Sequence, residues 1–162
     1  MSEELITDES GSIANDVKLY CFYGRAHIAL EVKRTGGAVE YCWWDRNCRK
    51  VKTGKYLNME LEDTIVSTEY FEAAEHLSQH IPAPFMRIDF LKSPTGPVFG
   101  EFTPQPGNFH QFDAATDCWL GRCYAEARGR LMADLLKGKA FSEYTEFVAS
   151  LNSGKSTDSP PA

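Results

Sequence analysis

The sequence has 162 residues, 43% of them hydrophobic and 25% charged, with a net charge of −6 at neutral pH. A chain of this length can form one domain that buries roughly two-thirds of its unfolded surface. The acidic balance argues against a nucleic-acid partner, no apolar run approaches the ~20 residues of a membrane span, and the acidic start lacks the regions of a signal peptide. We therefore expect a soluble, cytoplasmic protein.

The first half of the chain predicts a flexible start and three strands. Residues 1–16 mix acidic side chains with Gly, Ser and Asn, which is typical of a flexible, hinge-like segment. Alternating apolar residues at 17–23, 26–32 and 39–44, separated by glycine-containing turns, predict three consecutive antiparallel strands. Residues 45–63 are polar without a sustained period and predict a long surface connection.

The second half predicts two helices around a further strand pair. Ser67 or Thr68 can cap a helix that Pro82 ends, with Phe71, Ala74, Leu77 and Ile81 at helical spacing. Segments 85–91 and 98–102 read as strands joined by a Ser-Pro-Thr-Gly turn. The last helix is expected at about 117–137, with one apolar face formed by Leu120, Tyr124, Ala127, Leu131 and Leu135.

These elements predict an α+β fold in which a mostly antiparallel sheet carries about two helices on one face. We expect three parts: residues 1–16, a main subdomain at 17–140, and 141–162 as a short helix or coil with a disordered tail rich in Ser, Pro and Gly. The five cysteines match neither a CxxC pair nor a zinc module, so reduced thiols that fill the core are expected.

Two neighbouring strands carry the residues that point to chemistry. In each strand side chains alternate between faces, so Arg87 shares a face with Asp89, and Glu101 shares one with Thr103. If Asp89 lies directly opposite Glu101, Arg87 falls opposite Thr103, because antiparallel partners keep a constant sum of residue numbers. This register requires an odd number of loop residues, and a slip by one would send the two carboxylates to opposite faces.

Opposed carboxylates on one face predict a magnesium site. Directly opposed Cβ atoms lie about 4.5–5.5 Å apart, and Mg²⁺ prefers few carboxylates together with phosphate oxygens, which Asp89 and Glu101 would allow. We expect Arg87 to contact a transferred phosphate or an oxyanion, and Gly107 to let a backbone N–H approach a substrate oxygen. The residues alone leave a second interpretation open: an ordinary Arg87–Glu101 ion pair beside a solvated Asp89.

Segment 85–107 resembles the ATP-grasp signature of D-alanine–D-alanine ligases, in which an Arg-x-Asp strand precedes a Glu-x-Asn strand and a Pro-Gly loop. The resemblance implies that Asp89, Glu101 and Thr103 bind Mg²⁺ and that Arg87 touches the phosphoryl group. Thr103 replaces the family's asparagine, and its neutral hydroxyl is a weaker metal ligand.

The sequence is more similar still to the TupA-like ATP-grasp group, which is associated with cell-surface polysaccharide and teichuronopeptide synthesis. This resemblance spans roughly residues 3–137 and includes Trp43-Trp44-Asp45 and the segment around Lys18. It implies that Glu3, Glu4 and Leu5 end a strand that contacts the adenine and ribose of ATP, and that Lys18 contacts a phosphate or the substrate.

The resemblance implies an ATP- and Mg²⁺-dependent ligase that joins a small-molecule carboxylate to an amine through an acyl phosphate. Such ligases carry an upstream lobe with a phosphate-binding lysine and a glycine-rich loop, and this sequence shows neither. We therefore expect a fragment, a half that works with a separate lobe or as a homo-oligomer, or a chain without catalysis. The alternative hypothesis is a catalytically silent, ATP-grasp-derived module that binds a partner or a glycan.

Other residue pairs suggest weaker hypotheses. His76 and His80 have the four-residue spacing of a metal pair on a helix, but no third ligand follows the zincin pattern, so solvent-facing or capping roles are expected. Trp43-Trp44 could stack on a sugar, although packing is the expected role because one of two adjacent strand residues normally points into the core. His110 near Asp113 forms only a loop pair without a nucleophile motif.

Overall fold

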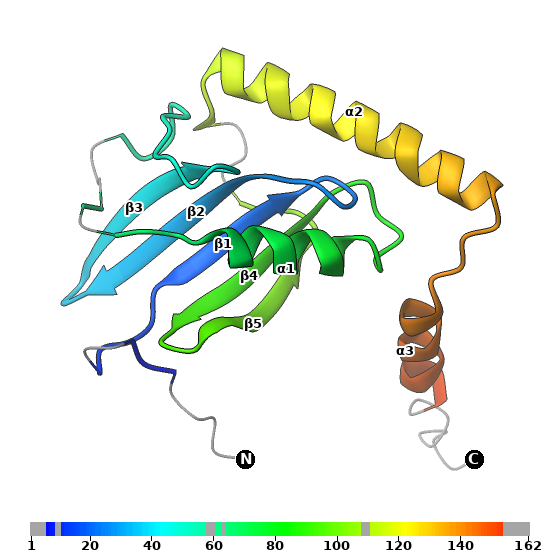
Figure 1. Cartoon of the computed structure of the whole chain (residues 1–162), viewed down its shortest axis with the longest axis horizontal. Helices are drawn as coiled ribbons and strands as arrows, with labels where there is room; N and C mark the ends of the chain where they lie inside the picture. Colours follow the sequence, from blue (N-terminus) through cyan, green and yellow to red (C-terminus); the bar gives the residue numbers. More distant parts are fainter. Residues whose placement is uncertain (1–5, 9–10, 58–60, 63, 108–110, 154–162) are drawn as a thin grey trace, which may run out of the picture.

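The fold is α+β, as predicted, with a five-stranded antiparallel sheet in the order β3-β2-β1-β4-β5 (Figure 1). The structure is a computed structural model that describes residues 6–8, 11–57, 61–62, 64–107 and 111–153. The expected strands are all present: β1 (Asp16–Cys21), β2 (Ala26–Thr35), β3 (Ala38–Asp45), β4 (Met86–Ser93) and β5 (Gly96–Thr103).

The helices within the described part of the chain are α1 (Thr68–Ser78), α2 (Ala114–Leu136) and α3 (Ser142–Ser153). Helix α2 begins earlier than expected because the Asp113 side chain caps it, accepting a hydrogen bond from the Thr116 backbone N–H at 2.7 Å. Its buried face also differs from the expectation, since Tyr124 and Leu135 are exposed whereas Cys123 is buried. No helix in the described ranges is both long and apolar enough to cross a bilayer.

Helices α1 and α2 cover opposite faces of the sheet, not one face as the sequence analysis expected. Helix α1 packs Phe71 and Ala74 against one face, together with the buried side chains of Leu19, Ile88 and Trp44. Helix α2 instead packs its buried residues against Tyr20, Phe22, Ile28, Leu30 and Trp43 on the other face. In Figure 1, α1 crosses in front of the strands and α2 runs past the upper end of the sheet. Each face carries an apolar cluster, and each cluster requires a cover.

The segment after β3 is not a surface connection throughout. Its backbone returns along β3, where the Val51 N–H donates to the carbonyl of Trp43 at 2.9 Å. Thr53 and Lys55 are buried, and the Trp43 indole N–H donates to the Lys55 carbonyl at 3.2 Å. The segment therefore forms a wall beside the face on which α2 packs.

Candidate active site

A row of directly paired residues crosses the whole sheet and organises the site. Lys18 on β1 pairs with Leu30 on β2 and with Asp89 on β4. Asp89 pairs in turn with Glu101 on β5, and Leu30 pairs with Trp43 on β3. Direct partners in adjacent strands project to the same face, so these side chains lie on the face covered in part by α2. The charged end of the row lies at β1, β4 and β5.

The register of β4 and β5 is the one predicted, but its cause differs. Asp89 pairs with Glu101 and Arg87 with Thr103. The loop between the strands has an even number of residues, because Ser93 pairs with Gly96 directly, so the expected odd loop was wrong. A bulge between Asp89 and Phe90 restores the register by leaving Gly100 unpaired.

Gly100 suits this bulge because the backbones approach closely there. A Cβ at this position would lie 3.1 Å from the carbonyl oxygen of Asp89. The extra residue also reorients the strand: Phe99 and Phe102 pack ring to ring, with centroids 4.8 Å apart, while Glu101 between them faces the charged row. The bulge thus places the Glu101 carboxylate beside Asp89. Without the bulge, the two-residue turn would put Glu101 on the other face of the sheet.

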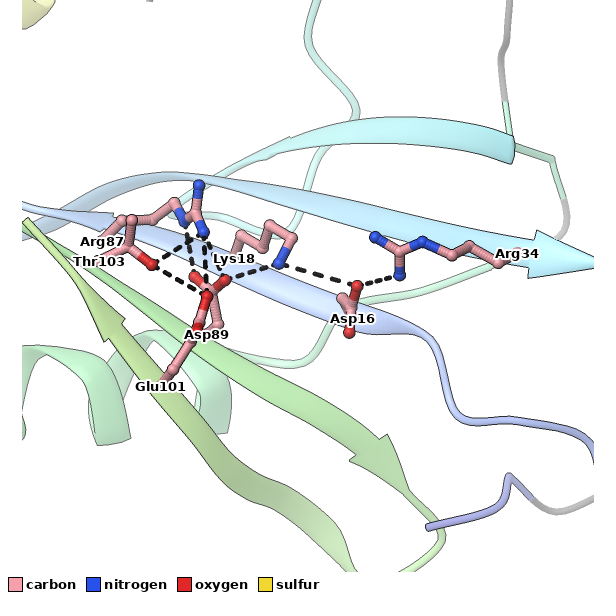
Figure 2. A network of polar contacts seen from close by, with 7 residues as sticks. All are labelled: Asp16, Lys18, Arg34, Arg87, Asp89, Glu101 and Thr103. Atoms are coloured by element: carbon pink, nitrogen blue, oxygen red, sulfur yellow. Dashed lines mark hydrogen bonds and ion pairs between the residues drawn. The ribbon is translucent and has the colours of Figure 1, made fainter. Parts of the chain in front are cut away.

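Asp89 is held by two cations from neighbouring positions (Figure 2). Arg87 donates from Nε to Oδ1 and from Nη2 to Oδ2, both at 2.7 Å, in a bidentate pair. Lys18 Nζ lies 2.6 Å from Oδ2 and 3.7 Å from Asp16 Oδ2, and Asp16 also pairs with Arg34. The Asp89 side chain is only 6% exposed, so its charge depends on these partners.

Glu101 is the open member of the cluster. Its side chain is 66% exposed, and Oε1 lies 3.6 Å from Arg87 Nη2. The Thr103 hydroxyl donates to the same Oε1 at 3.1 Å and accepts from Arg87 Nη2 at 2.9 Å. The carboxylates of Asp89 and Glu101 therefore both contact the Arg87 guanidinium. The alternative from the sequence, an Arg87–Glu101 ion pair beside a solvated Asp89, describes only part of this arrangement, because Asp89 is buried and bound to Arg87.

The donor set fits a magnesium ion that arrives with phosphate. A carboxylate has about four lone-pair sites, and Asp89 uses three of them, which leaves one on Oδ1, while Glu101 remains accessible. Because Arg87 and Lys18 already balance the two carboxylates in charge, a dication gains little attraction here without a further anion. Within the described residues, no group of three or more His, Cys, Asp and Glu side chains could hold a metal ion. A magnesium ion at this position would have two carboxylates from the chain within reach, and its remaining ligands would have to come from a phosphate or water.

Two groups that the sequence analysis missed border this cluster. Burial raises the pKa of Tyr20 to about 12, and the Arg87 charge opposes that shift. Lys55 is 4% exposed, and burial followed by the Arg87 charge lowers its pKa. A lysine in a polar segment without periodicity carries no sequence signal of burial, so only the tertiary structure identifies it.

The opposite face contains a third unexpected feature, a fully buried carboxylate. Glu31 Oε1 accepts from Lys92 Nζ at 3.0 Å, Asn15 Nδ2 at 2.9 Å and the Thr64 hydroxyl at 2.7 Å. Its Oε2 accepts from the Trp44 indole N–H at 3.2 Å. Every partner is contributed by the chain itself, which indicates a structural role.

The remaining candidates have different outcomes. Glu3, Glu4, Leu5 and His110 lie outside the described residues. Gly107 follows β5, and its carbonyl oxygen lies 3.5 Å from Lys55 Nζ; its catalytic role stays a prediction. Trp43 and Trp44 are both buried, one on each face of the sheet, so they do not form an exposed sugar platform.

The histidines and cysteines show no catalytic arrangement in the part of the chain described. His76 and His80 are exposed, with ring centroids 4.9 Å apart, and His80 Nδ1 lies 3.2 Å from Glu143 Oε2. All five cysteines are free thiols. Neither group lies in the charged row.

Comparison with known proteins identifies the family. The family model described as TupA-like ATPgrasp matches residues 1–125, which include the whole sheet, α1 and the first half of α2. No curated protein and no solved structure matches the chain. The matched span covers most of the sequence and includes every strand that carries the charged row. The chain therefore belongs to the TupA-like ATP-grasp family.

Proposed function

We propose that the chain is the nucleotide- and metal-binding module of an ATP- and Mg²⁺-dependent carboxylate–amine ligase. The observation that carries the proposal is the pair of carboxylates, Asp89 and Glu101, around one guanidinium on a partly open face. Membership of the ATP-grasp family supports ATP as the phosphoryl donor. The same membership favours a role in cell-surface polysaccharide or peptide-conjugate synthesis.

The proposed reaction has two steps that balance without a covalent enzyme nucleophile. A substrate carboxylate oxygen attacks the γ-phosphorus of ATP, the bond to the bridging oxygen breaks, and ADP leaves. An amine nitrogen then attacks the acyl carbon of the acyl phosphate, inorganic phosphate leaves, and the nitrogen loses a proton. In both steps the protein would position the reactants and stabilise charge, and it would form no covalent bond with them.

Each residue of the cluster has a role in this scheme. Glu101 and the remaining lone pair of Asp89 would hold Mg²⁺, which when bound supplies charge neutralisation of the ATP phosphates. Arg87 would stabilise charge on the transferred group, and Lys18 would fix Asp89 and contact a phosphate. Thr103 would orient Glu101 as a weak third ligand, and the Gly107 loop would approach the reacting acyl group. Glu3, Glu4 and Leu5 would contact adenine and ribose.

Titration calorimetry with ATP, with and without Mg²⁺, tests the proposal on the full chain. We expect Mg²⁺ alone to bind weakly, and ATP affinity to rise when Mg²⁺ is present. Asp89→Asn and Glu101→Gln should each lower the Mg²⁺-dependent affinity by about tenfold or more, because a charged ligand is lost. Glu40→Gln, which alters a strand carboxylate outside the cluster, is the control and should bind as the wild type does.

One observation favours the alternative, a catalytically silent binding module. Asp89 is already bound by Arg87 and Lys18, so the cluster is satisfied without a metal. Identical weak ATP binding in wild type, Asp89→Asn and Glu101→Gln, with no effect of Mg²⁺, would contradict the ligase proposal and support the silent module.

A further inference from the structure

Basic side chains gather around a second pocket, which shares no residue with the charged row. It lies between the turn that joins β1 to β2, the end of α1 and the last turns of α2, and its volume is about 340 Å³. Four cations line this cationic pocket: Arg25, Arg130, Lys137 and Lys139. Asp134 is the one acidic side chain among the described residues that line it. This excess of positive charge occurs in a chain whose net charge is −6.

The acidic side chains at the pocket neutralise these cations incompletely. Asp134 Oδ2 accepts from the Tyr23 hydroxyl at 2.8 Å and lies 3.7 Å from Lys139 Nζ. Glu126 Oε2 lies 3.9 Å from Nη1 of Arg25 and also 3.9 Å from Nη1 of Arg130. Both separations are too long for a hydrogen bond. Two guanidinium groups therefore flank one carboxylate oxygen without being hydrogen-bonded to it.

Arg130 and Lys137 retain donors that the chain does not satisfy. Arg130 Nη2 donates to the Phe22 carbonyl at 2.6 Å, but its Nε is buried and no hydrogen bond to that atom is found among the described residues. Burial, and then the Arg25 charge, lowers the pKa of Arg130. Within the described ranges, Lys137 Nζ has no hydrogen bond or ion pair. An anion in the pocket would supply partners to these groups.

Capping of helix ends accounts for only part of this charge. Lys139 Nζ donates to the Gln79 carbonyl at 3.0 Å, at the end of α1, so the fold itself explains Lys139. At the end of α2, the Lys137 and Gly138 backbone N–H groups bond the nearby carbonyls instead. Among the described residues, neither the Arg25 nor the Lys137 side chain donates to a helix carbonyl. These two cations have no structural role of that kind.

The rim of the cationic pocket is fixed before any ligand arrives. Tyr23 and Gly24 have positive φ values of 42° and 82°, and the Gly24 N–H donates to Ser78 Oγ at 2.9 Å. A Cβ at position 24 would lie 2.7 Å from Gln79 Nε2, so the turn packs closely on the end of α1. A preformed rim lowers the entropy that a ligand must lose on binding.

We propose that the cationic pocket binds a phosphate-bearing small molecule with at least two negative charges. Arg25 and Lys137 come from different elements, so they can reach separate oxygens of one ligand, and guanidinium groups suit phosphate oxygens. The volume is near the lower end of the range for small-molecule pockets, about 300–1,000 Å³. The site is separate from Asp89 and Glu101, and it adds a second anion-binding function to the chain.

Titration calorimetry of the full chain with inorganic pyrophosphate, in the absence of Mg²⁺, tests the pocket. We expect Arg25→Gln and Lys137→Gln each to weaken binding by about fivefold or more, because each removes a charged donor. Both side chains are exposed, so the fold should persist in both variants. Arg128→Gln removes the same charge from an exposed position of α2 that does not line the pocket. This matched control should bind pyrophosphate as the wild type does.

Citrate, titrated in the same way, separates phosphate from carboxylate chemistry. Pyrophosphate that binds more tightly than citrate, with a dependence on Arg25 and Lys137, supports the phosphate-bearing ligand. Citrate binding that is equal or tighter would overturn that assignment. Pyrophosphate binding that is absent from wild type, or equal in wild type, Arg25→Gln and Lys137→Gln, would overturn the pocket itself.

The same measurements separate this pocket from the ligase proposal. Pyrophosphate binding that is lost in Arg87→Gln but kept in Arg25→Gln would place the anion at the charged row, which refutes the cationic pocket alone. Pyrophosphate binding that requires Arg25 and Lys137, with ATP binding that responds neither to Mg²⁺ nor to Asp89→Asn, would refute the ligase proposal alone.

Discussion

The two faces of the sheet contain ion networks of similar composition and different access. On the α1 face, Glu31 binds Lys92 at 3.0 Å; on the other face, Asp89 binds Lys18 at 2.6 Å. Glu31 is fully buried, and three further donors from the chain satisfy it. Asp89 is also buried, but its partner Arg87 touches a carboxylate, Glu101, that is 66% exposed.

Access to solvent therefore distinguishes the two networks more than their composition does. A carboxylate whose partners all come from the chain has no position left for a ligand, and it holds strands together. A cluster that ends in an exposed acid on an edge strand remains accessible to a ligand, and in the proposal above it would accept Mg²⁺ together with a phosphate. The closed network is thus expected to determine stability, and the open one to determine binding.

The largest loss of stability is expected when the closed network around Glu31 is broken. Lys92→Met leaves the Glu31 carboxylate buried without its cation, so the free energy of unfolding should fall by about 3 kcal/mol, because a lone buried charge is costly. Lys18→Met on the open face should cost about 1 kcal/mol, since Arg87 continues to hold Asp89. Denaturant unfolding of both variants measures the contrast. Equal losses would show that the two networks do not differ in this way.

A smaller effect is expected from the bulge that builds the open cluster. Gly100→Ala places a Cβ 3.1 Å from the Asp89 carbonyl oxygen, which should lower stability by about 1 kcal/mol and also weaken Mg²⁺-dependent ATP binding. Gly121→Ala in α2 is the matched control. Its Cβ meets nothing within 4 Å, so it should raise stability by about 0.5–1 kcal/mol through helix propensity. Unchanged ATP binding in Gly100→Ala would show that the geometry of the bulge does not affect binding by the cluster.

The smallest effect emerges only in alkaline solution and compares one tyrosine from each face. The pKa of both Tyr20 and Tyr70 is raised to about 12, mainly by burial. The Arg87 charge opposes this rise for Tyr20, whereas the Glu31 charge adds to it for Tyr70. Between the unfolded value of about 10 and this folded value, the native protein retains a proton that the unfolded chain has lost. Stability is therefore complete below pH ~10 and falls as pH rises towards 12.

Tyr20→Phe and Tyr70→Phe should each flatten this alkaline loss, as measured by unfolding free energies between pH ~9 and ~11. The tyrosinate absorbance of each variant assigns the titration. If stability in wild type did not fall over this interval, neither tyrosine would be linked to folding as described. Replacement of Glu31 should shift the titration of Tyr70 and not that of Tyr20, which keeps the two faces distinct.

The sequence by itself determined which residues share a face within each strand, because side chains in an extended chain must alternate. That rule placed Arg87 on the same face as Asp89, and Glu101 on the same face as Thr103. The alternating pattern also located all five strands. Apolar spacing likewise located α1 and most of α2, since this signal is local, although the Asp113 cap that starts α2 was missed. Local rules failed at the bulge, where Gly100 and not the loop length sets the register.

Only the tertiary structure decided which distant residues meet. Lys18 reaches Asp89 across 71 positions of sequence, Lys55 approaches Gly107 across 52, and Lys92 finds Glu31 across 61. It also decided that α1 and α2 lie on opposite faces and that a polar segment buries a lysine. These outcomes depend on strand order and on which segments cover which apolar surface, and neither can be recognised as a periodic pattern in the sequence.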